Sequence, residues 1–221
     1  MKLLARTLTA FLFGLSITGT MLFLPAGTLA YRRGWLFLGL LFIPILIVGV
    51  VLLIKSPELL RKRLEMKEHE KGQQGIVAIS GLSLVTSFIV AGLDFRYGWS
   101  HITSSMVVIA SILLLASYAL YAEVLRENIY LSRVVEVQVG QHVIDTGLYA
   151  IIRHPMYFSV TLLYLAIPIV LGSWWALLAI SPCIILLVAR INNEEKVLLQ
   201  DLPGYTEYMK RVRYRMIPFI W

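Results

Sequence analysis

Charged side chains are scarce in this sequence of 221 residues. They make up 15% of it, whereas an average soluble domain has about 25%. Hydrophobic residues account for 58%. A soluble domain of this size has too little interior to bury so much apolar surface, and the exposed remainder would cause aggregation. The composition therefore argues against a soluble globular protein and directs attention to long apolar segments.

Cysteine is nearly absent, because Cys183 is the single one and lies inside an apolar run. The chain can therefore form no internal disulfide framework and no cysteine-based metal site, and we predict no metal. Internal repeats, low-complexity tracts and linkers long enough to separate soluble domains are also missing. We expect residues 1–221 to form a single membrane domain.

Long uncharged runs are what the sequence has in abundance. A run of about 20 apolar residues matches the hydrocarbon thickness of a bilayer. Four runs have the length of a single span, and they are residues 7–25, 34–54, 76–93 and 102–122. We therefore expect four transmembrane helices within residues 1–122.

A fifth uncharged run, residues 156–189, is too long for one crossing and is interrupted by Gly172 and Ser173. This pattern predicts a helical hairpin that is kinked at Pro168 and Pro182. The fold class we predict is all-α, a polytopic helical bundle in the membrane with about six crossings, of which the last two form the hairpin. Residues 123–221 would then hold the functional region, including the hairpin and a cytosolic C-terminal tail.

The distribution of basic residues indicates a topology. All Lys and Arg except Arg32, Arg33 and Arg96 fall on alternate loops, which by the positive-inside rule predicts cytoplasmic termini and a cytoplasmic site. The net charge of +7 is then mainly a topology signal, and no nucleic-acid partner is expected. Alternatively, residues 1–30 are a cleaved secretory signal, which would leave five crossings.

Polar residues gather at both ends of the predicted hairpin. Arg153 and His154 precede its first helix, and Pro155 disfavours helix at His154. Arg190 and Glu194 lie four residues apart beyond its second helix and so share one helix face. An ion pair at the membrane boundary would explain Arg190 and Glu194 taken alone. Because a hairpin brings its two ends to the same membrane face, the sequence predicts a site there.

These residues belong to a longer pattern that resembles the isoprenylcysteine carboxyl methyltransferase family, and the phospholipid methyltransferases are similar. The pattern consists of Gly147-Leu148-Tyr149-Ala150-Ile151-Ile152-Arg153-His154-Pro155-Met156-Tyr157, the hairpin, Glu194-Glu195, Leu198, Pro203-Gly204-Tyr205, Tyr208, Arg211-Val212 and Pro218. The order and spacing of the pieces carry the resemblance, since each piece alone is weak. The first four spans share with the family only that they are apolar segments of transmembrane length.

The resemblance implies a membrane enzyme that takes S-adenosylmethionine from the cytosol and an amphiphilic acceptor from the bilayer. The residues it implies for cofactor binding are Gln138, His142, Val143, Ile144, Tyr149, His154, Pro155, Met156, Tyr157 and Glu194. It places Arg190, together with Arg153, at the acceptor, and Arg190, Glu194 and His154 are the catalytic candidates. The sequence departs from the family in a shorter spacing between Gln138 and Gly147, and in Leu202-Pro203-Gly204-Tyr205 where Gly-x-x-Tyr is usual.

The chemistry of the residues agrees with methyl transfer from a sulfonium, which is an in-line displacement that needs alignment and exclusion of water rather than a metal. A carboxylate acceptor is already ionised near neutral pH and could pair with Arg190. We therefore expect a lipophilic or prenylated carboxylate as acceptor. The oligomeric state is left open.

Three alternatives remain at this point. The first is N-methylation of a phospholipid or another amine. The second is a sterol-type reductase that uses NADPH, because such reductases carry a similar His-Pro-x-Tyr segment, although their Lys-Tyr-Gly-x-x-Trp-type tail is absent here. The third is a non-catalytic membrane scaffold or a transporter. A transporter is expected to carry ionisable residues near the middle of its spans, and the uncharged runs contain none.

Overall fold

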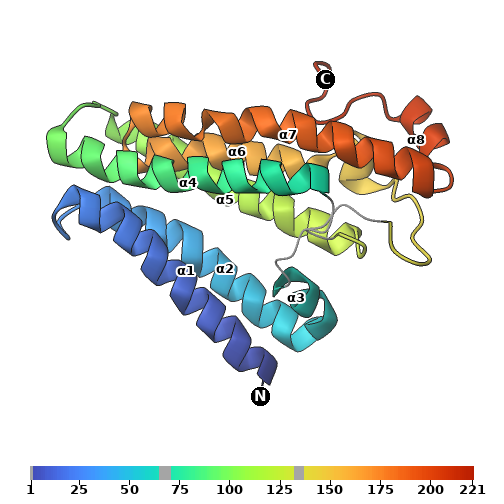
Figure 1. Cartoon of the computed structure of the whole chain (residues 1–221), viewed down its shortest axis with the longest axis horizontal. Helices are drawn as coiled ribbons and strands as arrows, with labels where there is room; N and C mark the ends of the chain where they lie inside the picture. The colour runs from blue at the N-terminus through green and yellow to red at the C-terminus, as the bar shows by residue number, and fades with distance from the viewer. Residues whose placement is uncertain (1, 65–70, 132–136) are drawn as a thin grey trace.

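The computed structural model describes residues 2–64, 71–131 and 137–221, which form helices joined by short connections (Figure 1). In chain order the elements are α1 (Lys2–Ala26), α2 (Arg32–Lys55), α3 (Pro57–Leu64), α4 (Lys71–Tyr97), α5 (Ser104–Glu127), the 3-10 turn η1 (Gly147–Ala150), α6 (Pro155–Leu171), α7 (Trp174–Asp201) and α8 (Tyr205–Arg211). The described residues contain no strand. The predicted all-α fold class is confirmed.

Five helices, α1, α2, α4, α5 and α7, are long and apolar enough to cross a membrane. The helix α6 is also apolar but has 17 residues, close to the lower limit for a span. It packs along α5 and against α7, while α1 packs on α4. The described residues therefore form a polytopic membrane bundle of apolar helices, of which α6 is the shortest.

The hairpin of α6 and α7 turns where the sequence predicted. Gly172 has φ 86°, in the left-handed region that a Cβ disfavours, and a Cβ there would lie 2.2 Å from Arg33 Nη1. Ser173 caps α7, because its Oγ accepts a hydrogen bond from the backbone N–H of Ala176. We call this end of the bundle the turn end, and the opposite end, with α8, the end of α5 and η1, the tail end (Figure 1).

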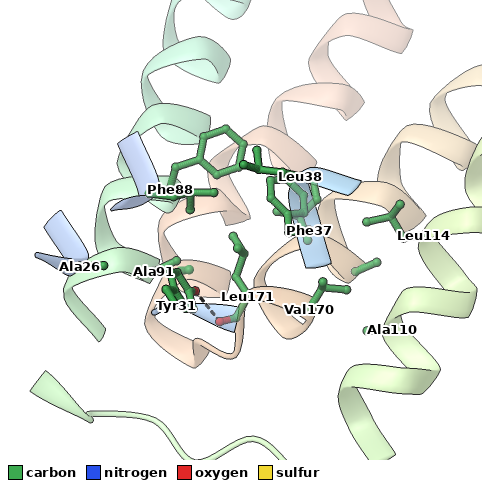
Figure 2. Close-up of a cluster of buried hydrophobic side chains, with 14 of the residues drawn as sticks. Ala26, Tyr31, Phe37, Leu38, Phe88, Ala91, Ala110, Leu114, Val170 and Leu171 are labelled. Atoms are coloured by element: carbon green, nitrogen blue, oxygen red, sulfur yellow. Dashed lines mark hydrogen bonds between the residues drawn. The ribbon is translucent and has the colours of Figure 1, made fainter. Parts of the chain in front are cut away.

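The main hydrophobic core lies between the helices and extends to the turn end. Aromatic side chains from α2 and α4, such as Phe37 and Phe88, meet aliphatic ones from α5 and α6, such as Leu114 and Val170 (Figure 2). The buried hydroxyl of Tyr31 donates to the carbonyl of Leu171, which ties the start of α2 to the end of α6. This packing fixes the hairpin against the rest of the bundle.

Towards the tail end, α1 and α2 diverge from the remaining helices (Figure 1). The tail end of α6 and α7 is instead packed by a second cluster that includes Tyr157, Leu187, Ile191 and Met216. Met216 comes from the C-terminal segment after α8. The tail end is thus assembled from segments that lie far apart in the sequence.

Candidate active site

An open cleft lies at the tail end, between the start of α6, the second half of α7, α8 and the loop before η1. The cleft is lined by most of the residues for which the sequence implied cofactor binding, namely His142, Val143, Ile144, Tyr149, His154, Met156, Tyr157 and Glu194. The structure therefore brings these residues together in one space.

The two ends of the hairpin meet at the hydroxyl of Tyr157, in the first turn of α6. This hydroxyl donates to Glu194 Oε2 at 2.5 Å and accepts from Arg190 Nε at 3.0 Å. Arg190 and Glu194 lie one turn apart on α7, so both reach the same phenol. The orientation of the Glu194 carboxylate in the cleft is thereby fixed by a neutral donor.

Glu195, the neighbour of Glu194, is the centre of a buried ionic network. Its Oε1 accepts from Arg153 Nε at 2.8 Å and lies 3.2 Å from His154 Nε2, and its Oε2 accepts from Arg215 Nε at 2.9 Å. Arg153, His154 and Glu195 are each less than 10% exposed. The Glu195 carboxylate thus compensates the buried guanidinium of Arg153, which would otherwise be costly to bury, and also pairs with the partly exposed Arg215.

The C-terminal segment runs alongside the start of α6. The backbone N–H of Arg153 donates to the carbonyl of Tyr214, and that of His154 donates to the carbonyl of Arg215. Arg153 Nη1 donates to the carbonyls of Val212 and Arg213. Pro155 at the first helical position leaves these two N–H groups outside the helix, where the tail can pair with them.

A third wall of the cleft is fixed by the end of α5. Asn128 Nδ2 donates to the hydroxyl of Tyr149 at 2.9 Å, and the Tyr208 hydroxyl donates to the carbonyl of Tyr149 at 2.8 Å. The Glu127 carboxylate accepts from Thr146 and from the N–H of Leu148. The positive φ of 50° at Gly147 favours glycine, and a Cβ there would displace the Glu127 carboxylate that holds this turn.

Two of the implied cofactor residues are not among those that line the cleft. Gln138 donates through Nε2 to the carbonyl of Tyr130, and Gln141 Oε1 accepts from its backbone N–H. Pro155 starts α6 and acts on the site through the backbone of His154. Arg190 is not among the residues that line the cleft but contacts Tyr157, which is. Arg153 lines the cleft and is also engaged by Glu195 and the tail. Their roles in binding stay predictions.

Several functional candidates were not assigned a role from the sequence. Glu195 and Arg215 form the network described above, and Tyr205 lines the cleft from α8 with a buried hydroxyl that has no hydrogen-bond partner within the described residues. The paired glutamates and the Pro-Gly-Tyr piece did mark Glu195 and Tyr205 as parts of a pattern. Which of the two glutamates faces the cleft depends on the packing of α7.

Comparison with known families gives one match. Residues 106–202 match the sequence model of the family described as phospholipid methyltransferase. This segment is somewhat less than half of the chain, runs from the first turn of α5 to the end of α7, and includes the hairpin and most of the cleft residues. No curated protein matches the chain. The resemblance to this family is confirmed over residues 106–202, and the match supports a membrane methyltransferase.

Proposed function

We propose that this integral membrane protein is an S-adenosylmethionine-dependent methyltransferase and that its acceptor is a carboxylate on a lipophilic molecule. One observation carries the proposal. Residues from both ends of the hairpin and from the loop before η1 line a single cleft, inside the segment that matches a methyltransferase family. On the charge distribution of the loops, we further propose that the cleft and both termini face the cytoplasm.

The lining of the cleft fits the methyl donor. S-adenosylmethionine supplies an electrophilic methyl group on a sulfonium, and it also carries an ammonium, ribose hydroxyls and a flat apolar adenine. The Glu194 carboxylate can accept hydrogen bonds from the ammonium or from ribose. Val143, Ile144 and Leu198 offer apolar surface to a ring. The buried hydroxyl of Tyr205 has a hydrogen-bonding capacity that a polar ligand could use.

The contribution of the protein to catalysis is alignment and exclusion of water. Hydrogen bonds fix the Glu194 carboxylate and the Tyr149 ring at two positions in the cleft, so a bound donor would be held in one orientation. His154 is buried against Glu195 and tied to the tail, which suits a positioning role better than a proton-transfer role. An ionised carboxylate needs no general base, and Arg190 can pair with it.

A second acceptor class is favoured by a different observation. The family that matches residues 106–202 is described by its action on phospholipids, and the headgroup methylated in such a reaction is an amine. An amine must lose a proton before it attacks, and Glu194 is the carboxylate in the cleft that could accept it. The two acceptor classes therefore predict different roles for Arg190 and Glu194.

Donor binding is tested by calorimetric titration of the purified protein in detergent with S-adenosylmethionine and S-adenosylhomocysteine. We expect saturable binding, and we expect Glu194→Gln to weaken it at least about tenfold, since it removes a charge-assisted hydrogen bond. Glu207→Gln, an exposed position on α8, is the matched control and should leave the affinity unchanged. If the folded wild-type protein binds neither compound, the proposal is wrong. Titration with NADPH tests the reductase alternative in the same preparation.

The acceptor is tested by supplying the donor with a labelled methyl group to protein in bilayers. One set of bilayers contains a prenylated cysteine with a free carboxylate, and the other contains phosphatidylethanolamine. A methyl ester releases its label as methanol in mild base, whereas an N-methyl group does not. Base-labile label in the first set supports the carboxylate proposal. If label appears in the second set and not in the first, and is stable to base, the carboxylate proposal is wrong and the acceptor is an amine.

A further inference from the structure

Tyr205 is an exception among the tyrosines of the cleft. It lies in the first turn of α8, its side chain is 4% exposed, and its hydroxyl oxygen has no hydrogen-bond partner among the described residues. By contrast, the hydroxyls of Tyr149, Tyr157 and Tyr208 bond to Asn128, to Glu194 with Arg190, and to the Tyr149 carbonyl. Among the tyrosines that line the cleft, Tyr205 is the one whose buried hydroxyl has no hydrogen-bond partner within the described residues.

An unused buried hydroxyl has an energetic cost. A buried polar group without a partner lowers the stability of a protein by about 1–3 kcal/mol relative to a paired one. The rest of the Tyr205 side chain packs with Leu202, Tyr208 and Val212 in a small cluster, so a phenylalanine would serve the packing equally well. The packing of this cluster therefore gives the hydroxyl no role.

The charges around Tyr205 restrict the kind of ligand group that it can meet. Burial raises the pKa of the Tyr205 hydroxyl well above its ordinary value near 10, and the carboxylates of Glu195 and Glu194 raise it further, against a smaller opposite effect of Arg153. The hydroxyl consequently stays protonated and can donate. Because two carboxylates act at this position, an anionic ligand group is disfavoured, and a neutral oxygen is the suitable acceptor.

We propose that the Tyr205 hydroxyl donates a hydrogen bond to a ribose hydroxyl of the bound methyl donor, and that the same ribose donates to Glu194. This inference rests on the proposed function. A ribose hydroxyl is neutral and can accept from the phenol while it donates to a carboxylate. Tyr205 and Glu194 both line the cleft, and the Glu194 carboxylate is near enough to raise the pKa of the Tyr205 hydroxyl. The pair would distinguish adenosyl compounds with an intact sugar from those that lack a hydroxyl.

The experiment measures binding of S-adenosylhomocysteine and of its 2′-deoxy and 3′-deoxy analogues to the wild type and to Tyr205→Phe. For the intact ligand we expect a loss of affinity of roughly three- to tenfold in the variant. For the analogue that lacks the contacted hydroxyl, the wild type and the variant should bind equally. Tyr97→Phe, at an exposed residue of the turn end, is the matched control and should not change any affinity.

Thermal unfolding is a second measurement, in which a ligand-binding role of Tyr205 predicts a different result from a purely structural role. Without ligand, Tyr205→Phe should unfold at the same temperature as the wild type or higher, because it removes an unpaired buried hydroxyl. Saturating S-adenosylhomocysteine should raise the unfolding temperature of Tyr205→Phe by less than it raises that of the wild type. The loss of affinity should also stay constant between pH 7 and 9, because the pKa of Tyr205 is raised.

The outcomes separate this inference from the proposed function. If the wild type does not bind S-adenosylhomocysteine, the proposed function fails. If the wild type binds and Tyr205→Phe binds equally well, the donor site stands and the role of Tyr205 is refuted. An equal loss for the intact ligand and both deoxy analogues would also refute the ribose contact, since the variant would then act through the shape of the cleft.

Discussion

The two ends of the helical bundle each bury a carboxylate, but they satisfy it in different ways. At the turn end, Asp94 accepts from the N–H and hydroxyl of Ser100 and from the hydroxyl of Ser173. At the tail end, Glu195 is engaged by Arg153, His154 and Arg215. Neutral donors surround the first carboxylate, and guanidinium groups together with an imidazole surround the second.

The different partners of Asp94 and Glu195 indicate how one hairpin can combine a rigid end with a candidate binding site at the other end. The donors of Asp94 belong to connections between neighbouring helices, so this carboxylate closes the bundle locally. The donors of Glu195 come from the start of α6 and from the C-terminal segment, so this carboxylate holds the walls of the cleft together. We therefore expect substitutions at the turn end to change stability alone, and substitutions at the tail end to change stability and ligand binding together.

The largest effect is expected for Glu195→Ala. Removal of this carboxylate leaves the guanidinium groups of Arg153 and Arg215 without their anionic partner. Breaking a buried ionic network from one side typically lowers the free energy of unfolding by about 3–5 kcal/mol. Equilibrium unfolding in mixed detergent micelles measures the loss, and titration with S-adenosylhomocysteine should show weaker binding. If Glu195→Ala has the same stability and affinity as the wild type, the proposed difference between the two ends is wrong.

A smaller effect is expected for Asp94→Asn at the turn end. The amide keeps the shape of the carboxylate but weakens its charge-assisted bonds to Ser100 and Ser173, which we expect to lower the free energy of unfolding by about 1–3 kcal/mol. The folded variant should bind S-adenosylhomocysteine as the wild type does. A loss of affinity comparable with that of Glu195→Ala would show that the two ends are coupled.

Gly147 and Gly172 allow the same comparison between the two ends, because both have positive φ and a Cβ at either would push against a charged side chain, Glu127 or Arg33. Replacement by alanine should cost about 1–2 kcal/mol in the free energy of unfolding at either position, from backbone strain. Gly147→Ala should in addition weaken ligand binding, since Tyr149 is fixed by this turn. Equal affinities of the two variants would contradict this expectation.

The smallest effect is expected for Ser173→Ala. The variant loses the N-cap of α7, which is typically worth about 1 kcal/mol, and one donor to Asp94. Ser181→Ala is a suitable control, because that hydroxyl bonds within its own helix and caps nothing. The unfolding temperature of Ser173→Ala should fall below that of the control, with no difference in ligand affinity between them.

Much of the fold could be predicted because the bilayer fixes the length of a span. The uncharged runs correspond to α1, α2, α4, α5 and the hairpin, and the interruption at Gly172 and Ser173 marks the turn. The extension of α7 to Asp201 follows from the polar residues that continue the helix beyond Ala189. The bilayer sets no such limit on the connections, so the path of residues 137–146 could not be predicted.

The convergence of the candidate residues could be predicted, but their pairings could not. Hairpin geometry requires Tyr157 and Glu194 to lie at the same end. It does not decide which of two adjacent glutamates faces the cleft, because neighbouring side chains on a helix point about 100° apart and the choice depends on packing. The tail also pairs through the backbone carbonyls of Tyr214 and Arg215, and every residue has such a carbonyl, so no sequence pattern marks these contacts.

The attachment of the C-terminal segment to Arg153 and His154 has a consequence for biosynthesis. The apolar helices α1, α2, α4, α5, α6 and α7 can enter the membrane one after another as the ribosome delivers them. The cleft, however, requires the carbonyls of residues 212–215 and the guanidinium of Arg215, which are made after all the spans. A nascent chain whose helices up to α7 are inserted therefore still lacks these contacts, and the candidate cleft is complete only when residues 212–215 have folded back onto the start of α6.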